Sequence, residues 1–256
     1  MGKTEEKGID PRGLTAPMLA FCALLLQPAI ATADPAAKVH LPTVVQGETE
    51  FELLGGYQWW RNNEDNRLRQ FIGEVGYGVT SWWKTELGAG TTRLPNESYK
   101  LDEIEWENIF ALTEPGQYWL DLGLFVELAH DHPDGRNAIA IGPMFQKEIE
   151  SMQANLNVFF ERELGAGADP GAAVNYEWQL KWRGDRRFEP GVQGFGTLGT
   201  TNNFGHETAS RIGPALFGQV STGLRSKFKY DAAVMFGLNN NTPNTTLRFQ
   251  IEYELN

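Results

Sequence analysis

The sequence predicts an all-β protein, an antiparallel transmembrane β-barrel of about 12 strands, and three observations predict it. Apolar and polar residues alternate strictly over long stretches, these stretches recur from residue 47 to the end of the chain, and tryptophans gather near their ends. Strict alternation gives a strand one apolar face and one polar face, whereas a helix would scatter the same residues around its surface.

The alternation is clearest in three stretches. Apolar residues occupy every second position from Val174 to Trp182 and from Leu247 to Leu255. A third stretch runs from Leu120 to Leu128, where the pattern predicts that Leu124 faces lipid and Phe125 faces the lumen. A charge at position 124 is therefore expected to cost more stability than a charge at position 125.

Similar stretches divide the chain into twelve expected strands, and short connections join them. The strands are expected near residues 47–60, 66–78, 82–92, 99–112, 117–129, 137–149, 153–165, 173–184, 189–200, 208–221, 226–238 and 245–256. Connections after odd strands are longer than most of those after even strands, as expected for outer loops and periplasmic turns. An even strand count then leaves both termini in the periplasm.

A soluble β-sandwich or propeller also shows alternation and frequent turns. The expected strands are longer than the ~5–6 residues typical of globular strands, and their polar face is heavily charged. Trp59, Trp82, Trp119 and Trp182 lie near strand ends, where barrels carry aromatic girdles, although other tryptophans lie further inside the strands. These features favour the membrane barrel.

Composition narrows the function classes. The 256 residues carry a net charge of −11, from 22 Lys and Arg against 33 Asp and Glu, which argues against binding nucleic acid. No stretch after residue 34 is apolar for long enough to form a membrane-spanning helix.

The N-terminus has the features of a secretory signal peptide. Basic residues precede an apolar stretch, Met18 to Leu26, and a run of small residues ends at Ala33. We therefore expect three parts, namely a cleaved signal peptide over 1–33, an N-terminal periplasmic segment over 34–46 and an outer-membrane barrel over 47–256. Two alternatives remain, a lipoprotein anchored through Cys22 and a retained membrane anchor. Cleavage before Asp34 leaves a chain without cysteine.

If the apolar face meets lipid, the charged face lines the lumen, where acids outnumber bases. This pattern predicts either a passive channel that favours cations or a lumen filled by ion pairs. The candidate lumen charges are Glu103, Glu105, Glu107, Lys84, Lys181, Arg183, Arg211 and Arg248.

Two clusters have alternative chemistries. Glu103, Glu105 and Glu107 share one strand face, where they would bind a divalent cation or pair with Lys84 on the preceding strand. The sequence His130-Asp131-His132-Pro133-Asp134 offers metal ligands, but its Pro-Asp-Gly ending is typical of a solvated turn. We assign no metal, cofactor or catalytic residue to either cluster.

Several segments carry a resemblance to a known family. The segments GETEFELLGGYQ, WENIFALTEPGQYWLDLGL, IGPMFQKE, RIGPALFG and TLRFQIEYEL resemble an uncharacterised Gram-negative outer-membrane β-barrel family. They are similar in style to the outer-membrane proteins assigned to phenol meta-degradation. The resemblance covers nearly the whole chain after the leader and implies a place in the outer membrane, with its lipids and the barrel assembly machinery as partners. The last residues, Tyr253 to Asn256, lack the terminal aromatic that such families usually carry.

The sequence thus predicts an outer-membrane β-barrel protein, either a narrow passive channel for small polar or cationic solutes or a structural membrane protein. The alternatives are a soluble periplasmic β-protein and an outer-membrane lipid-modifying enzyme. The enzyme would need a nucleophile beside a histidine, and His206 with Ser210 is the available pair.

Overall fold

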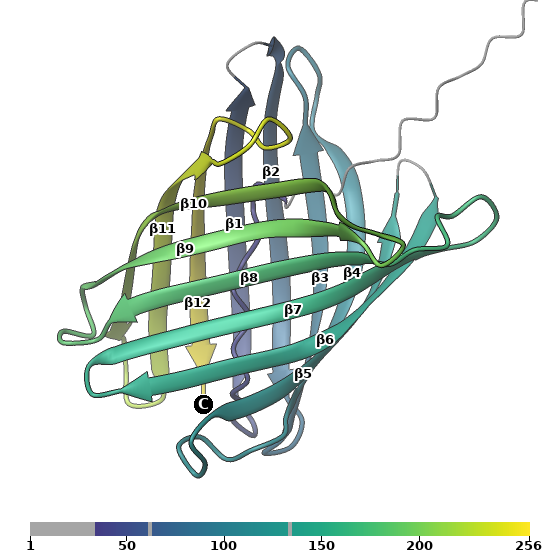
Figure 1. The fold of residues 1–256 in the computed structure, drawn as a ribbon. Helices are drawn as coiled ribbons and strands as arrows, with labels where there is room; N and C mark the ends of the chain where they lie inside the picture. Colours follow the sequence, from purple (N-terminus) through teal and green to yellow (C-terminus); the bar gives the residue numbers. More distant parts are fainter. Residues whose placement is uncertain (1–33, 61–62, 133–134) are drawn as a thin grey trace, which may run out of the picture. The chain divides into compact units, whose positions relative to one another are not determined.

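The computed structural model of the protein describes residues 34–60, 63–132 and 135–256. The expected signal peptide, residues 1–33, lies outside the described residues. The compact unit from Ala31 to Asn256 contains a closed barrel of twelve antiparallel strands (Figure 1), which confirms the predicted fold class. No helix in the described part of the chain is long and apolar enough to cross a membrane.

The strands follow the sequence in simple order around the barrel. They are β1 (Thr49–Trp60), β2 (Asn63–Gly78), β3 (Trp83–Arg93), β4 (Lys100–Ala111), β5 (Asp121–Asp131), β6 (Arg136–Ile149), β7 (Met152–Leu164), β8 (Ala173–Trp182), β9 (Glu189–Thr200), β10 (Asn203–Ser221), β11 (Ser226–Gly237) and β12 (Thr245–Leu255).

Each strand pairs with its neighbours in sequence, and β1 pairs with β12 to close the sheet. In that closing pair Thr49 lies opposite Leu255, so the start of β1 and the end of β12 lie at the same end of the barrel. Closure leaves no unpaired edge strand, which is a condition for a sheet that spans lipid.

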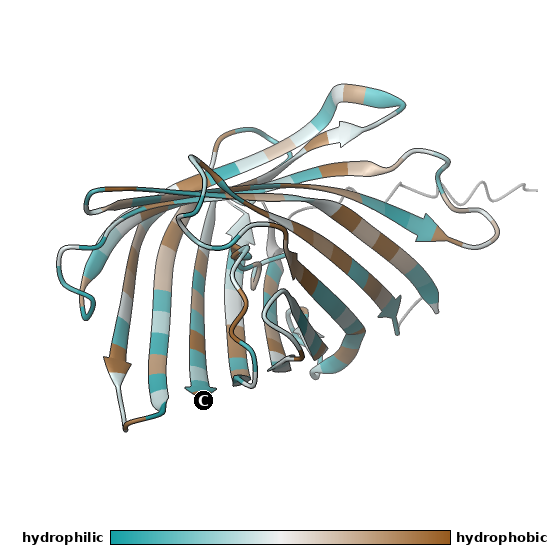
Figure 2. Ribbon diagram, turned by 90° about the horizontal axis from the view of Figure 1, so that it is seen from below, coloured by the Kyte–Doolittle hydropathy of each residue, from teal (hydrophilic) through white to brown (hydrophobic). Residues whose placement is uncertain are grey.

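Alternation explains which face each residue takes. Figure 2 shows polar and apolar bands alternating along the strands. On β3, Leu87 is 63% exposed on the outside, whereas its neighbour Glu86 is 1% exposed on the inside. Since a single closed sheet has only these two faces, the period-two pattern sorts the side chains between lipid and lumen.

Two glycine–proline pairs interrupt the ladder between neighbouring strands. Gly142–Pro143 on β6 and Gly213–Pro214 on β10 have no ladder partners on β7 and β11 respectively, although the register is the same on both sides of each pair. Proline has no amide hydrogen to donate to the ladder. A Cβ on either glycine would overlap a neighbouring carbonyl oxygen, of Val158 or of Val234. These pairs therefore bring neighbouring backbones close at a local irregularity.

The expected alternation of long and short connections is wrong. The connection over residues 112–120 follows the even strand β4 and is the longest in the described chain. The connection over residues 201–202 follows the odd strand β9 and is a tight hairpin. The even strands β2 and β10 begin inside what the sequence suggested were loops, at Asn63 and Asn203, so loop length does not indicate which end faces out.

The inner face is also less uniformly charged than expected. Ring and methionine side chains on inward positions form two buried apolar clusters, one around Phe125 and Phe159 and one around Phe195 and Phe217. A strand position that faces the lumen is therefore not automatically polar. The lumen has apolar walls beside its charged walls.

The segment before β1 differs most from expectation. Residues 34–46, expected to be a periplasmic segment, contact strands around the barrel, including β2, β4, β8 and β10. Only a segment inside the barrel can contact so many of its strands. In Figure 1 this segment, in purple, runs along the lumen toward the end where β1 starts.

Candidate functional site in the barrel lumen

Backbone contacts hold the start of the N-terminal segment, which we define as residues 34–46. The amide of Ala36 donates to Gln70 Oε1 on β2 at 3.2 Å, and Arg211 on β10 donates to the Asp34 carbonyl oxygen. The same residues form a turn, in which the Ala37 amide donates a hydrogen bond to the Asp34 carbonyl oxygen at 3.0 Å. The segment is thus attached to well-separated strands.

Lys38 is the centre of the charged contacts. Its ammonium lies 3.6 Å from Glu52 Oε2, 3.9 Å from Glu86 Oε2 and 3.1 Å from Glu107 Oε2, and it donates to Glu74. These acids lie on β1, β3, β4 and β2 respectively. One cation therefore binds four neighbouring strands to the N-terminal segment.

Register explains why a cation is needed there. Glu52 lies directly opposite Glu74 in the β1–β2 ladder, and Glu86 lies directly opposite Glu107 in the β3–β4 ladder. Like charges directly opposite each other destabilise a sheet. The Lys38 ammonium offsets this repulsion in a place that water reaches poorly, since the four carboxylates are at most 9% exposed.

His40 makes the second charged contact. Its Nε2 lies 3.3 Å from Glu107 Oε1, and its Nδ1 lies 3.2 Å from both oxygens of Glu177. A neutral imidazole has one donor and one acceptor nitrogen, so one of these contacts would place two acceptors together. Both contacts are satisfied when the ring is a doubly protonated cation. His40 then bridges β4 and β8.

Apolar side chains of the segment contact the apolar walls. Val39 belongs to the cluster around Phe195 and Phe217, and Val44 packs against the cluster around Phe125. Burial of such side chains is worth roughly 1.5–3 kcal/mol each. The segment is held by apolar packing as well as by charge.

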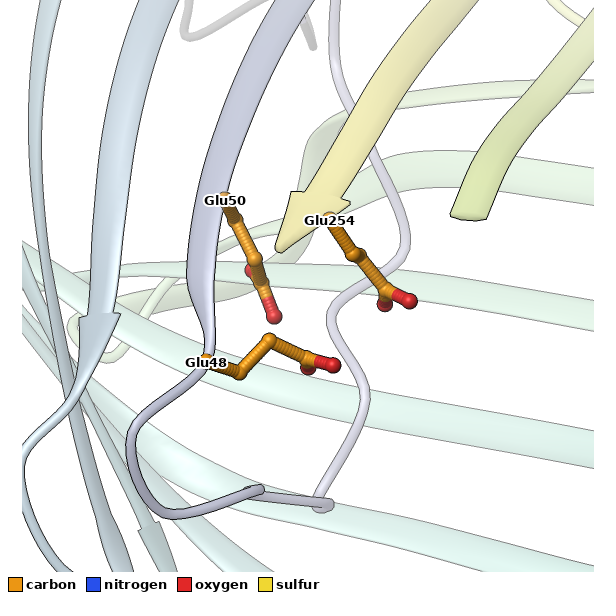
Figure 3. Close-up of side chains that lie close together, drawn as sticks. All are labelled: Glu48, Glu50 and Glu254. Carbon is orange, nitrogen blue, oxygen red and sulfur yellow. The ribbon is translucent and has the colours of Figure 1, made fainter. Parts of the chain in front are cut away.

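A cavity of about 430 Å³ remains beside the segment, and at its mouth the lining residues lie beside the start of β1 and the end of β12. Its walls carry both charge signs, with acids on β1 and β12 and bases on β8 and β11. Figure 3 shows three of the acids, Glu48, Glu50 and Glu254, pointing toward one another at this mouth. The cavity is polar and large enough for a small hydrophilic solute.

The candidate acids on β4 lie side by side on its inner face. Glu105 and Glu107 are buried, and Glu103 is half-buried. In the part of the chain that the structure describes, carboxylate oxygens of Glu105 and Glu107 come within 4.8 Å of each other and of Glu127 on β5. Glu103 is not part of that group. The third acid of this group therefore comes from the neighbouring strand and not from β4.

The expected pairing of Lys84 with the β4 acids is wrong. The Lys84 ammonium lies 2.7 Å from Glu50 Oε2 and 3.3 Å from Glu86 Oε1. In the β3–β4 ladder Lys84 lies opposite Ile109, beyond the end of the acid row. It therefore pairs with β1 and with its own strand.

The candidate bases on β8 and its following turn share one acid. Lys181 Nζ lies 3.5 Å from Glu189 Oε2, and Arg183 Nε lies 3.3 Å from Glu189 Oε1. Glu189 begins β9, so these pairs join adjacent strands at the cavity wall.

The candidate bases Arg211 and Arg248 flank Phe195. Their guanidinium carbons lie 5.3 Å and 5.6 Å from the ring centroid, within the range of cation–π contacts. Arg248 Nη1 also donates to Gln193 Oε1 at 2.6 Å, which links β12 to β9 across the lumen.

Among the described residues, neither of the two candidate clusters at the barrel rim contributes to a metal-like group. His130 Nδ1 lies 2.9 Å from Asn137 Oδ1, and none of the metal-like groups within the described ranges contains His130 or His132. Pro133 and Asp134 lie outside the described residues. The Ser210 hydroxyl pairs with the Tyr176 hydroxyl at 2.7 Å, which leaves the enzyme hypothesis without support from His206.

Sequence reasoning missed Lys38 and His40. Residues 34–46 show no alternation, and their acid partners lie far away in sequence, up to 137 residues for His40 and Glu177. The one available signal was the excess of inward acids over inward bases.

Comparisons with known proteins show the fold. No protein-family model and no curated protein matches the sequence. The porin NanC matches with a TM-score of 0.54 and 11% identity, covering 80% of this chain and 99% of NanC. An outer membrane channel from Pseudomonas putida F1 matches with a TM-score of 0.54 and 14% identity, covering 87% and 98%. The translocator domain of the autotransporter NalP from Neisseria meningitidis matches with a TM-score of 0.50 and 8% identity, covering 82% and 88%. The chain thus has the fold of outer-membrane β-barrel proteins.

Proposed function

We propose that the protein is a Gram-negative outer-membrane channel for small polar or cationic solutes, closed by its own N-terminal segment. An apolar outer face, a closed sheet and a charged lumen support this proposal. The similar folds of a porin and of an outer membrane channel also support it.

The observation that carries the proposal is the contact of Lys38 with acids on four strands. These acids line the lumen that a solute would pass through. The same acids bind the N-terminal segment, which blocks that lumen. A wall rich in carboxylates attracts cations once it is open. Opening then requires loss of the Lys38 contacts.

Several expectations from the sequence belong to this proposal. They are cleavage before Asp34, a periplasmic position for the end of the barrel where β1 starts and β12 ends, and membership of the family similar to the phenol meta-degradation proteins. Both Gly-Pro pairs of the quoted segments lie at ladder interruptions, which supports a common barrel design. Outer-membrane lipids and the assembly machinery are the proposed partners.

Planar-bilayer conductance of the refolded protein tests the function. Changing Lys38 to Ala removes the central ion pairs of the segment, so we expect open events to become at least tenfold more frequent. In a salt gradient, the reversal potential should indicate preference for cations.

Lys229→Ala is the matched control. It removes a lumen lysine that pairs with Glu252 and Glu254, which are not among the four acids around Lys38, so it should leave the frequency of opening near that of the unmodified protein. Correctly folded Lys38→Ala protein that carries no current would reject the channel and favour a structural role. Anion preference would contradict the role of the acidic wall.

A further inference from the structure

We propose that Arg69 and Arg93, on the outer face of β2 and β3, together bind the phosphate of an anionic membrane lipid. The inference goes beyond the proposed channel, because these side chains lie on the face of the sheet that meets the bilayer and not the lumen. It names a chemical class of lipid and a place on the barrel where that lipid is held.

Register brings the two guanidinium groups together on one face. Arg69 lies directly opposite Arg93 in the β2–β3 ladder. Arg69 points outward, because its neighbour Gln70 points into the lumen, where it is 1% exposed and accepts the Ala36 amide. Side chains directly opposite each other in an antiparallel pair have Cβ atoms about 4.5–5.5 Å apart. One small anion can therefore contact both arginines.

The two arginines lack an acid partner. Among the residues that the structure describes, no carboxylate pairs with Arg69 or Arg93. Each lies over a tyrosine ring instead, with the Arg69 guanidinium carbon 5.2 Å from the Tyr57 centroid and that of Arg93 5.5 Å from the Tyr99 centroid. A ring offers no oxygen acceptor to the N–H donors of a guanidinium. Two like charges thus face each other across the ladder, which is destabilising until an anion lies between them.

The position of the pair along the barrel matches the level of lipid headgroups. On the same strands the outer face is apolar, with Val75 50% exposed and Leu87 63% exposed. The arginines end this apolar surface on the side away from the start of β1, where Thr49 pairs with Tyr77. Tyrosines are enriched at the level of the headgroups, and a cation on the lipid face is tolerated there.

Phosphate is the headgroup that suits two arginines. A guanidinium donates two parallel hydrogen bonds to phosphate oxygens, and its charge strengthens both. A phosphate between Arg69 and Arg93 would satisfy donors of both groups and offset their repulsion. The acyl chains of the same lipid would lie on the apolar surface around Val75 and Leu87, which a free phosphate ion cannot use. The geometry therefore favours a lipid over a soluble anion.

Arg162 on β7 provides a contrast. It is exposed, and it lies on the outer face near the same end of the barrel. Its partner in the β6–β7 ladder is Ile139, so no second guanidinium lies opposite. Arg162 carries the same charge as Arg69 but cannot share one phosphate with a neighbour across the ladder.

Native mass spectrometry of the refolded protein in a neutral detergent tests the inference. We expect one phosphatidylglycerol to bind per chain at least tenfold more tightly than diacylglycerol with the same acyl chains. Arg69→Gln and Arg93→Gln should each lower the affinity for phosphatidylglycerol at least fivefold. Arg162→Gln, the charge-matched control, should leave that affinity unchanged. Inorganic phosphate at the concentration of the lipid should not displace it.

Thermal unfolding gives a second measurement. Phosphatidylglycerol should raise the unfolding temperature of the unmodified protein and of Arg162→Gln more than that of Arg69→Gln or Arg93→Gln. Equal lipid affinity in all four proteins would overturn the proposal, and so would an equal loss at position 162, which would reflect net charge alone. Displacement by inorganic phosphate would replace the lipid with a soluble anion. A dimer that dissociates in Arg69→Gln would replace it with a second copy of the chain.

Discussion

Phe125 shows how much a single inward position depends on its neighbours. Its side chain is 1% exposed, stacks on Phe159 with centroids 4.5 Å apart, and lies 4.4 Å from the His40 ring. Alternation correctly gave the inward direction of Phe125. It also suggested a polar surrounding that would accept a charge, and this was wrong because apolar residues from several strands meet there.

The first prediction compares the two faces at this point. Leu124→Arg places a charge on the outer face and should cost about 2–4 kcal/mol of unfolding free energy near mid-bilayer. Phe125→Ala removes a packed ring and should cost about 3–5 kcal/mol. Urea unfolding in lipid vesicles measures both values. A cost below about 1 kcal/mol for Phe125→Ala would contradict the packing around this ring.

Among the elements, β6 and β10 illustrate how a local sequence shapes a strand. Each carries a Gly-Pro pair, and each loses ladder contacts with the following strand at that point. The proline explains the missing amide donor, and the glycine explains how close the next strand comes. A larger residue at either glycine would force the neighbouring strand away.

The second prediction tests that close approach. A Cβ at Gly213 would overlap the Val234 carbonyl oxygen, so Gly213→Ala should destabilise the barrel by about 1–3 kcal/mol. Gly73 on β2 has nothing within 4 Å of its Cβ position, which makes Gly73→Ala the control. Thermal unfolding in detergent should show a loss for position 213 and almost none for position 73. Equal losses would mean that glycine content, and not the close approach, sets stability.

Across the whole barrel, pairing of Thr49 with Leu255 puts the start of β1 and the end of β12 at one end. Which of the two ends faces the periplasm stays a prediction from the sequence. We expect the end with Glu114 to face the periplasm and the end with Asn241 to face outward. Asp134, expected on the outer side as well, lies outside the described residues.

Cysteine labelling tests this orientation. In a chain carrying Cys22→Ser, an impermeant reagent on intact cells should label Asn241→Cys strongly and Glu114→Cys only after the outer membrane is permeabilised. Labelling of position 114 alone on intact cells would reverse the orientation.

The sequence by itself determined the number, order and approximate limits of the strands. The largest differences are at β10, which begins at Asn203 where 208 was expected, and at β5, which begins at Asp121 where 117 was expected. Alternation is a local property of each strand. A single closed sheet has only two faces, so the alternating side chains can be divided in only one way between lipid and lumen.

Only the tertiary structure decided what fills the lumen. Lys38 and His40 lie in a segment without periodicity, and their acid partners come from separate strands that meet through barrel closure and register. The partner expected for Lys84 was wrong for the same reason, because a difference of a few residues in register places a different acid beside the lysine. Ion pairing depends on distances of a few ångströms, whereas the sequence pattern specifies only which face of the sheet a residue takes.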